Sequence, residues 1–346
     1  MRTFDDVLIK PRYSEIETRD SVDLTTELKL TRLKRAITLR IPLCNAAMDT
    51  ISSSALCRTL YELGGLPVLH RNCTPEQQKD MLTESGIPDD YPVVLSISVN
   101  DYEERLRRFD PGRNIIISID IAHAHSVKAK RTVEWLVDHY PDHAIMIGSI
   151  ATAEAVYDTM AWGADIFRVG IGAGSVCTTR IVTGIGVPQL DAVLECADAA
   201  PGSVIADGGI RNSGDGMKAL VAGASLIMLG NVLAGTDDTP GMIIDIQGKL
   251  YKQYRGMASK EVAVSLTARK EQSVYEEGAD ALVLYKGSTR QIVHGFCRGL
   301  RSGLSYIGCD SMEGVTTADF IDITPNVTRE NGVHDVIARA TSEAVR

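Results

Sequence analysis

Short runs of β-branched and other apolar residues recur along the chain, and each ends in a polar residue or a glycine. A segment with a helical pattern follows each run. Near-continuous apolar runs are typical of parallel strands that are covered on both faces. The pattern predicts eight strands, over residues 42–47, 66–70, 93–99, 114–121, 143–148, 166–170, 203–207 and 225–230.

Helix signals lie between these runs. Thr74 is a suitable N-cap, Pro75 follows it at the first helical position, and Gln77 completes a capping box. Helical spacing or caps also occur at 126–136, 152–156 and 213–220. The alternation of strand and helix predicts an α/β fold of the (β/α)8 TIM-barrel type. An open, doubly wound sheet is the alternative, although no G-x-G-x-x-G follows the first strand.

No linker rich in Pro, Gly or Ser divides the 346 residues. We therefore expect one barrel domain over 1–346, with a C-terminal extension from about residue 235. This extension would begin with a hairpin or loop at 244–254 and continue through a charged segment at 258–277. A barrel of this type needs roughly 250 residues, so the chain is long enough for it.

Charge and cysteine content narrow the class of protein. The net charge is −9 without a basic block, which argues against nucleic acid as the main ligand. No apolar run approaches the ~20 residues of a membrane helix, and residues 1–6 show no apolar signal region. The seven cysteines are odd in number and scattered, with no C-x-x-C. These features predict reduced thiols in the cytoplasm and no contact with a membrane.

The most distinctive stretch is 169–189, V-G-I-G-A-G-S-V-C-T-T-R-I-V-T-G-I-G-V-P-Q. Its glycines let backbone N–H and C=O groups approach an ion. Cys177 follows them in a polar loop, between Ser175 and the run Thr178-Thr179-Arg180. A thiol among backbone dipoles and beside an arginine is a candidate nucleophile. The alternative is a buried cysteine that packs as a small hydrophobic residue.

Active sites of such barrels lie at the C-terminal ends of the strands. Asp207, with Gly208 and Gly209 behind it, could bind the hydroxyls of a ribose, although it could equally be a helix N-cap. Gly230-Asn231 follows the eighth strand, where a phosphate is often bound. Other polar strand ends are Asp49, Thr50, His70, Arg71, Ser98 and Asp120.

Two further clusters carry weaker signals. Asp120, His123 and His125 could be interpreted as metal ligands, but the spacing favours histidines that line a pocket. Residues 254–257, Y-R-G-M, could supply donors beside a glycine or could form a surface turn.

These motifs resemble the IMP dehydrogenase/GMP reductase family over most of the chain. The segments that carry the resemblance are 4–11 (F-D-D-V-L-I-K-P), 47–50 (A-M-D-T), the 170–189 loop, 206–211 (A-D-G-G-I-R), 228–231 (M-L-G-N) and 254–257. The resemblance implies a barrel that binds a purine nucleotide, in which Cys177 attacks C2 of the base.

The resemblance also implies roles for other residues. The nucleotide would contact Met48, Ser175, Asp207, Gly208, Gly209, Gly230, Asn231, Tyr254, Arg255, Gly256 and Met257. A nicotinamide cofactor would contact Asp120, Ile121, Ala122, His123 and Gly170. Carbonyls of Gly172, Gly174 and Cys177 could hold K⁺. Thr179, Glu277, Asp120 and Arg71 would join Cys177 in catalysis, and the subunits would form a homotetramer.

The family carries out two reactions. A dehydrogenase oxidises IMP with NAD⁺, whereas a reductase deaminates GMP with NADPH. The Arg-Tyr pair of the dehydrogenase flap is missing between 257 and 277, and no regulatory (CBS) domains are inserted near 84–91. The loop D-I-A-H-A-H-S at 120–126 also resembles the reductases. These features favour a GMP reductase.

Other segments leave alternatives open. Residues 180–189 and 70–76 resemble dehydrogenases, so an IMP dehydrogenase without CBS domains is the first alternative. Ala47 and 147–150, I-G-S-I, depart from both patterns, which would suit a modified or deoxy purine nucleotide. A non-catalytic nucleotide sensor and a flavin-dependent barrel oxidase are more distant possibilities.

Overall fold

The computed structural model describes residues 1–110, 112–256, 277–324 and 327. Eight parallel strands form one sheet in the order β4-β11-β10-β9-β8-β7-β6-β5. Cys44 in β4 pairs in parallel with Leu66 just before β5, so the sheet closes on itself. The strands are β4 (Leu43–Asn45), β5 (Val68–Leu69), β6 (Val93–Ile97), β7 (Ile115–Asp120), β8 (Ala144–Ile150), β9 (Ile166–Val169), β10 (Val204–Asp207) and β11 (Leu226–Leu229).

Closure confirms the predicted TIM barrel and excludes the open, doubly wound sheet. All eight predicted strands are present. The observed boundaries lie within two residues of the predicted ones, and only β8 runs past its predicted range, because it continues to Ile150 with an irregularity in register between Gly148 and Ile150. The glycine at 148, taken in the sequence as the end of the strand, instead lies against the side chain of Arg168 on β9.

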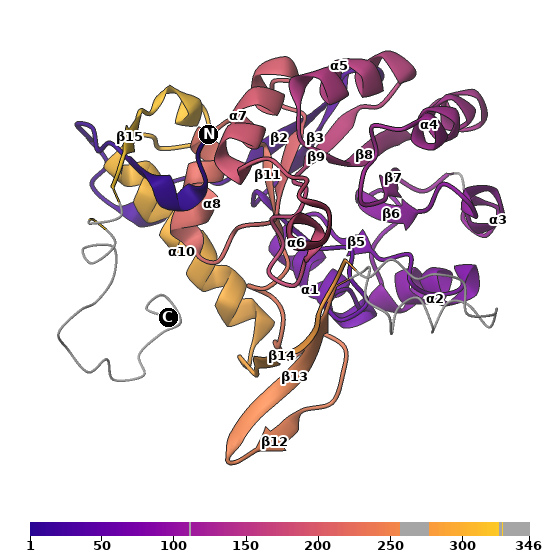
Figure 1. Ribbon diagram of the computed structural model, residues 1–346. Helices are drawn as coiled ribbons and strands as arrows, with labels where there is room; N and C mark the ends of the chain where they lie inside the picture. The colour runs from indigo at the N-terminus through magenta and orange to yellow at the C-terminus, as the bar shows by residue number, and fades with distance from the viewer. Residues whose placement is uncertain (111, 257–276, 325–326, 328–346) are drawn as a thin grey trace.

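Helices surround the barrel (Figure 1). Thr74 caps its helix with the expected reciprocal capping box to Gln77. Only residues 86–92 join that helix to β6, so no domain is inserted there. The described helices are α1 (Ser54–Leu63), α2 (Pro75–Ser85), α3 (Tyr102–Leu106), α4 (Val127–His139), α5 (Ala153–Trp162), α6 (Thr179–Thr183), α7 (Gln189–Ala199), α8 (Ser213–Val221) and α10 (Thr289–Tyr306).

Two buried layers hold the barrel together. One lies inside the strands, where side chains such as Val94, Ile116 and Ile205 meet those of the hairpin β2 (Thr26–Leu30) and β3 (Arg35–Leu39). This hairpin therefore plugs one end of the barrel. The other layer packs the outward faces of the strands against the helices. The residues predicted to form the site lie at the opposite end of the barrel, where the strands finish.

The chain beyond β11 has two parts. A three-stranded antiparallel sheet, β12 (Ile244–Ile246), β13 (Lys249–Arg255) and β14 (Asp280–Leu284), projects from the barrel, as Figure 1 shows. The hairpin predicted at 244–254 is thus confirmed. Helix α10 then packs against both α8 and α1 and so completes the ring of helices. The division into one domain with an extension from about residue 235 stays a prediction.

Short elements tie the chain termini to this body. The 3-10 helix η1 (Phe4–Asp6) precedes β1 (Val7–Ile9), which pairs with β15 (Phe320–Asp322). Two further 3-10 turns, η2 (Arg19–Ser21) and η3 (Val315–Thr317), flank α10 and α8. Within the described ranges, no helix has both the length and the apolar content to cross a membrane.

Candidate active site

The loop that follows β9 carries Cys177. It leaves the barrel through Gly170, where φ is +150° and a Cβ would lie only 1.9 Å from the carbonyl oxygen of Asp207. Glycine is therefore required for β9 and β10 to approach this closely at their ends. The loop then turns into α6, which lies in the middle of the view in Figure 1.

Cys177 is partly exposed, unlike the fully buried Cys44, Cys57 and Cys196. Its Sγ lies 3.1 Å from Oγ1 of Thr179, and that hydroxyl donates to Oε2 of Glu277 at 2.7 Å. The alternative of a cysteine packed in the core is therefore wrong. The structure brings together three of the predicted catalytic residues in one hydrogen-bonded row.

Backbone pairing explains how Glu277 reaches this row from far along the chain. The N–H of Thr178 donates to the carbonyl of Glu277 at 2.9 Å, and Cys177 forms an antiparallel bridge with Gly278. The N–H of Ala279 donates in turn to the carbonyl of Val176 at 2.9 Å. Residues 277–279, directly before β14, thus serve as a short strand-like partner for the cysteine loop.

A second row of charged side chains crosses the mouth of the barrel. Arg168 on β9 donates to Oδ1 of Asp120 and to Oδ2 of Asp207, both at 2.6 Å. Arg71 donates from Nε to the carbonyl of Asp120 at 2.7 Å, and this nitrogen lies 3.6 Å from Oδ2. Burial raises the pKa of Asp207, and the adjacent guanidinium of Arg168 opposes that rise. Asp120, Asp207 and Arg71 are thereby connected through Arg168.

Sequence reasoning missed Arg168. The signal was present, because an arginine interrupts the apolar run I-F-R-V of β9, which is buried along its whole length. A charged side chain in such a strand must find a partner of opposite charge. The two aspartates at the ends of β7 and β10 are those partners.

A third group of residues surrounds the end of β11. The hydroxyl of Tyr254 is hydrogen-bonded to the side chain of Ser175, and burial raises the pKa of this tyrosine. That hydroxyl lies 3.2 Å from the place where a Cβ on Gly230 would stand, and the sulfur of Met48 lies 3.9 Å from it. The hydroxyls of Tyr254 and Ser175 and the bare backbone of Gly230 form a group of donors suited to a phosphate.

The loop after β10 lies against the cysteine loop. Gly208 has φ of +96°, and a Cβ there would be 3.1 Å from the N of Gly174. Gly209, with φ of +76°, lies beside the ring of Phe4. Asp207 ends β10, while Asn212 is the residue that caps α8. The alternative that Asp207 is an N-cap is therefore wrong.

Other predicted binding residues are held by bonds within the protein. Arg255 donates to the carboxylate of Asp49 at 2.5 Å, and its N–H donates to the hydroxyl of Thr50. The carbonyl of Asn231 accepts from Lys286 at 2.5 Å. Gly256 approaches Gly278 so closely that a Cβ would lie 2.7 Å from its Cα. Met257 and the segment 258–276, where a flap was sought in the sequence, lie outside the described residues.

The predicted cofactor loop follows β7. The N–H of Ile121 donates to the carbonyl of Gly148, and Ala122 and His123 are exposed. His125 is bonded through Nε2 to Asp158 at 2.7 Å, with its ring tilted over Trp162. In the part of the chain that the structure describes, no cluster of three or more His, Cys, Asp or Glu could hold a metal. The interpretation of these histidines as metal ligands is therefore not supported.

The carbonyls predicted to hold K⁺ belong to the same turn as Cys177. Gly172 has φ of +73°, and the N–H of Cys177 donates to the carbonyl of Gly174 at 3.1 Å. Backbone carbonyl oxygens can coordinate an alkali cation. The carbonyl oxygen of Gly174 thus already accepts one N–H, and K⁺ binding at this turn stays a prediction.

His70 ends β5 close to Asp49 and Asp120. Its Nδ1 accepts the N–H of Asn72 at 3.1 Å, so the neutral ring carries its proton on Nε2. Burial lowers the pKa of His70 to about 4, although the nearby Asp49 opposes this. The ring is thus an uncharged donor near the rim.

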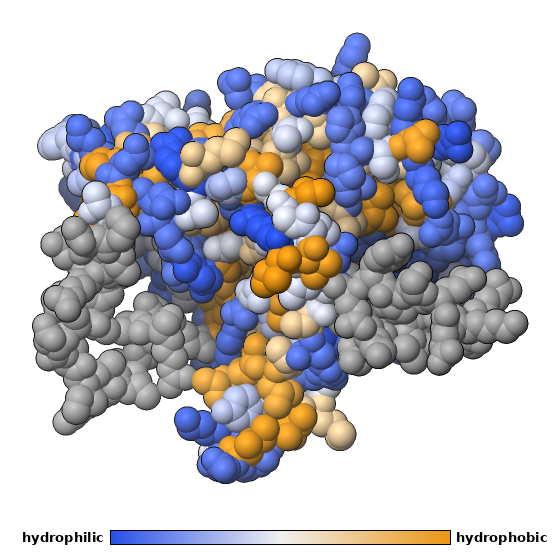
Figure 2. Space-filling view, in the orientation of Figure 1, coloured by the Kyte–Doolittle hydropathy of each residue, from blue (hydrophilic) through white to orange (hydrophobic). Residues whose placement is uncertain are grey.

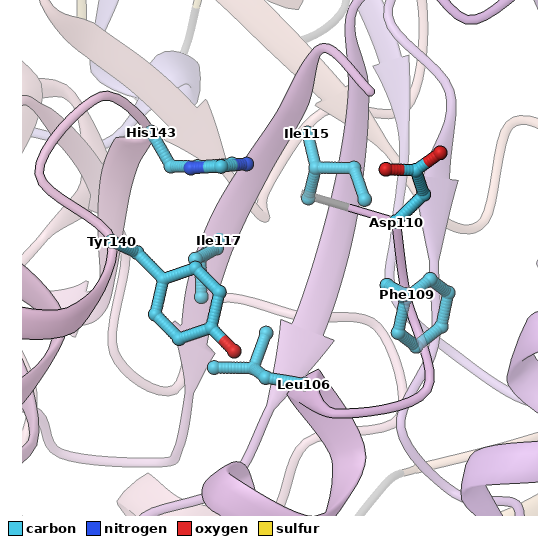
Figure 3. A pocket seen from close by; sticks show the side chains of 7 residues that line it. All are labelled: Leu106, Phe109, Asp110, Ile115, Ile117, Tyr140 and His143. Atoms are coloured by element: carbon cyan, nitrogen blue, oxygen red, sulfur yellow. The ribbon is translucent and has the colours of Figure 1, made fainter. Parts of the chain in front are cut away.

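A small hollow elsewhere on the barrel is unconnected with this site. It lies between the end of α3 and the starts of β7 and β8, where Figure 3 shows Leu106, Tyr140 and His143 around it. These strand starts are at the opposite end of the barrel from Cys177. The residues that line it, most of them apolar, make it a packing defect.

Comparisons with known proteins agree with this geometry. Residues 1–334 match the family model described as the IMP dehydrogenase / GMP reductase domain. Inosine-5′-monophosphate dehydrogenase of Cryptosporidium parvum is 34% identical, over 96% of this chain and 95% of that protein. GMP reductase of Phytophthora infestans is also 34% identical, over 98% of this chain and 94% of that protein.

A solved structure is similar along the whole chain. GMP reductase C318A of Trypanosoma brucei, in complex with guanosine 5′-monophosphate, superposes with a TM-score of 0.89 at 27% identity, over 97% of this chain and 98% of that one. The closed barrel, its cysteine loop and the match over residues 1–334 lead to one conclusion: this chain belongs to the IMP dehydrogenase/GMP reductase family of oxidoreductases.

Proposed function

We propose that the protein is a GMP reductase, which converts GMP to IMP and ammonia through a covalent bond between Cys177 and C2 of the purine. The row Cys177–Thr179–Glu277 is the observation that carries this proposal. A reductase must deliver a proton to a departing amino group, and this row ends in a carboxylate that can do so.

The hydrogen bonds set the direction of proton movement. Because the hydroxyl of Thr179 donates to Glu277, its lone pairs face the thiol of Cys177. The thiol proton therefore passes to Thr179 as that residue passes its own to Glu277. The thiolate then bonds to C2 of GMP.

The same proton then completes the deamination. Glu277, now protonated, returns it through Thr179 to the amino nitrogen on C2, and the C2–N bond breaks as ammonia departs. The carboxylate is regenerated and the purine remains bonded to sulfur. General acid–base steps of this type contribute typically 10²–10⁴-fold to a rate.

The remaining nucleotide contacts would come from the charged row at the mouth of the barrel and from the residues around the ends of β10 and β11. Asp207, oriented by Arg168, would hold the ribose hydroxyls, while Ser175, Tyr254 and the backbone at Gly209 and Gly230 would hold the phosphate. Met48 would lie against the base. These groups come from several strand ends of the barrel and from β13, which would fix the position of C2 relative to Cys177.

The charged row supports a nicotinamide site next to the nucleotide. Asp120 is joined through Arg168 to Asp207, so the loop at 120–123 adjoins the ribose side of the pocket. NADPH, when bound, supplies the hydride that replaces sulfur at C2. Arg71, Asp120, His123 and Gly170 would orient it, and carbonyls of Gly172, Gly174 and Cys177 would hold K⁺ near the cysteine loop.

The choice of reaction rests on Glu277 and on the short 86–92 connection, which leaves no room for CBS domains. Relatives with either activity match at 34% identity, so IMP dehydrogenase is the second candidate. The dehydrogenase-like sequence at 180–189 favours it. We further propose a cytoplasmic homotetramer.

The test is an assay of the purified protein with each substrate pair, followed by nicotinamide absorbance. Loss of NADPH with GMP is expected, and formation of NADH from IMP and NAD⁺ would instead establish a dehydrogenase. Glu277→Gln should lower the kcat for GMP by about 10²–10⁴-fold, with unchanged GMP affinity. Glu84→Gln, which alters a carboxylate bonded to Ser54 between α1 and α2, is the control.

Binding of GMP without turnover of either pair would favour a nucleotide sensor. Cys177→Ala separates the possibilities further, because it should abolish turnover while GMP still binds. Full activity in that variant would remove the covalent step.

A further inference from the structure

The cysteine loop has little packing of its own. Helix α6 buries none of its side chains, and Ile181, Val182 and Ile185 are 86%, 57% and 64% exposed. Figure 2 shows hydrophobic atoms at the surface where Figure 1 places α6. Apolar packing therefore holds the loop at Ile171, Val176 and Val187, which lie partly buried against the core, but not around α6.

Arg180 is the side chain that joins the two ends of this loop. Its Nε and Nη2 donate to the carbonyl of Ile171 at 3.2 and 3.1 Å. The same Nη2 donates to the carbonyl of Val187 at 2.6 Å. The first bond encloses residues 171–180, with Cys177 inside, and the second encloses 180–187.

Two glycines make room for this arginine. A Cβ on Gly172 would lie 2.5 Å from Cγ of Arg180, and a Cβ on Gly186 would lie 2.6 Å from its Nε. Real Cβ atoms do not approach heavy atoms so closely, so the side chain fits only because both positions lack one. The planar guanidinium can direct neighbouring N–H groups of one edge at two carbonyls, which a lysine ammonium cannot do with the same rigidity.

We propose that Arg180 is a positioning residue for the proposed reaction: it clamps the ends of the 171–187 loop and thereby holds the sulfur of Cys177 beside Thr179 and C2 of the purine. The hydrogen bonds of its side chain go to the carbonyls of Ile171 and Val187 and not to the side chain of Cys177 or Thr179. The proposal rests on the proposed function for its kinetic part only, because the clamp itself can be measured without substrate.

Arg180→Ala is the first variant. We expect kcat with GMP to fall about 100-fold, as for a reacting group displaced by about 1 Å, while KM stays within about threefold. Thermolysin, which cuts before exposed apolar residues, should cleave at Ile181, Val182 and Ile185 at least about tenfold faster, because the loop opens locally. Fragment masses identify these cuts, and circular dichroism checks the fold.

Gly186→Ala is the second variant. It tests whether the effects of Arg180→Ala come from loss of the clamp or from a general folding defect. Gly186 lacks a left-handed φ, so alanine is allowed there by the backbone and acts only by crowding Arg180. It should reproduce both effects in the wild-type background and add nothing in Arg180→Ala. Effects that simply add in the double variant would overturn the proposal.

Arg40→Met is the matched control. Arg40 also donates to a backbone carbonyl, that of Glu62, and also lies against a glycine, Gly64. It stands before β4, at the other end of the barrel, so kcat and cleavage at 181–185 should not change.

The clamp is overturned if Arg180→Ala leaves both kcat and the thermolysin rate as in wild type. If the wild-type protein turns over neither substrate pair, the proposed function fails, and the thermolysin comparison alone still decides whether Arg180 clamps the loop.

Discussion

Arg168→Met should be among the most damaging single changes to this protein. The arginine side chain is 9% exposed, and those of Asp120 and Asp207 are 12% and 22% exposed. Methionine has a similar length but carries no charge. The substitution therefore leaves two carboxylates at the mouth of the barrel without their shared cation.

The size of the loss of stability depends on which ion-pair partner each carboxylate keeps. Asp120 retains Arg71, with Nε 3.6 Å from its Oδ2, whereas Asp207 loses the ion pair that the structure gives it. Removal of one partner from a buried pair costs about 3–5 kcal/mol. Since whole proteins are stable by about 5–15 kcal/mol, this is a large fraction of the total.

The loss of stability in Arg168→Met should also depend on pH. Without Arg168, burial raises the pKa of Asp207 in the folded state above its unfolded value, with nothing left to oppose it. The ionised carboxylate of Asp207 is then less favourable in the folded protein than in the unfolded chain. The loss in the free energy of unfolding is therefore largest near pH 7, where the carboxylate is ionised. It shrinks as the pH falls and the carboxyl becomes protonated.

Urea unfolding at pH 7 and pH 5 is the assay, together with calorimetric titration of GMP. Adding Asp207→Asn to Arg168→Met should restore part of the stability, because no lone charge remains. Arg32→Met is the control: Arg32 pairs with the buried Asp165 at the other end of the barrel, so it should cost stability without affecting GMP binding. A change below about 1 kcal/mol for Arg168→Met would refute the reasoning.

Three other predictions follow from the site. Because burial lowers the pKa of His70 to about 4 while the unfolded chain takes up a proton near 6.5, stability should fall by about 2 kcal/mol from pH 7 to pH 5. His70→Gln should flatten that slope in urea unfolding, and an unchanged slope would contradict it. Gly170→Ala should cost about 3 kcal/mol or more, whereas Gly248→Ala, with a left-handed φ but open space around it, should cost about 1 kcal/mol. Tyr254→Phe should weaken GMP binding about tenfold by calorimetry without altering the fold, and equal affinity would place the phosphate elsewhere.

Local sequence patterns were enough for the barrel. Each strand is a run of apolar residues bounded by polar ones, and helices such as α2, α5 and α8 carry their own caps, so these elements could be identified without knowing their partners. Thr74 and Gln77 show this well, because both halves of that capping box lie within four residues.

The cysteine loop is only partly local. Its glycines and Cys177 are contiguous, so the sequence indicated a nucleophile in a polar turn. Glu277 lies 98 residues from Thr179, and only the pairing of residues 277–279 with the loop shows that the two side chains meet.

What the sequence by itself determined is therefore the set of elements and the chemistry carried by short motifs, since these depend on contacts within a few residues. The tertiary structure alone decided the partners of Arg168 and Arg180. A buried arginine is stable only where folding brings it an acceptor, and closure of the barrel sets Asp120 and Asp207 on either side of Arg168, 48 and 39 residues away along the chain. Such distances carry no pattern along the chain, because the contacts join side chains on different strands of the sheet: β10 adjoins β9, and β7 is separated from β9 by β8.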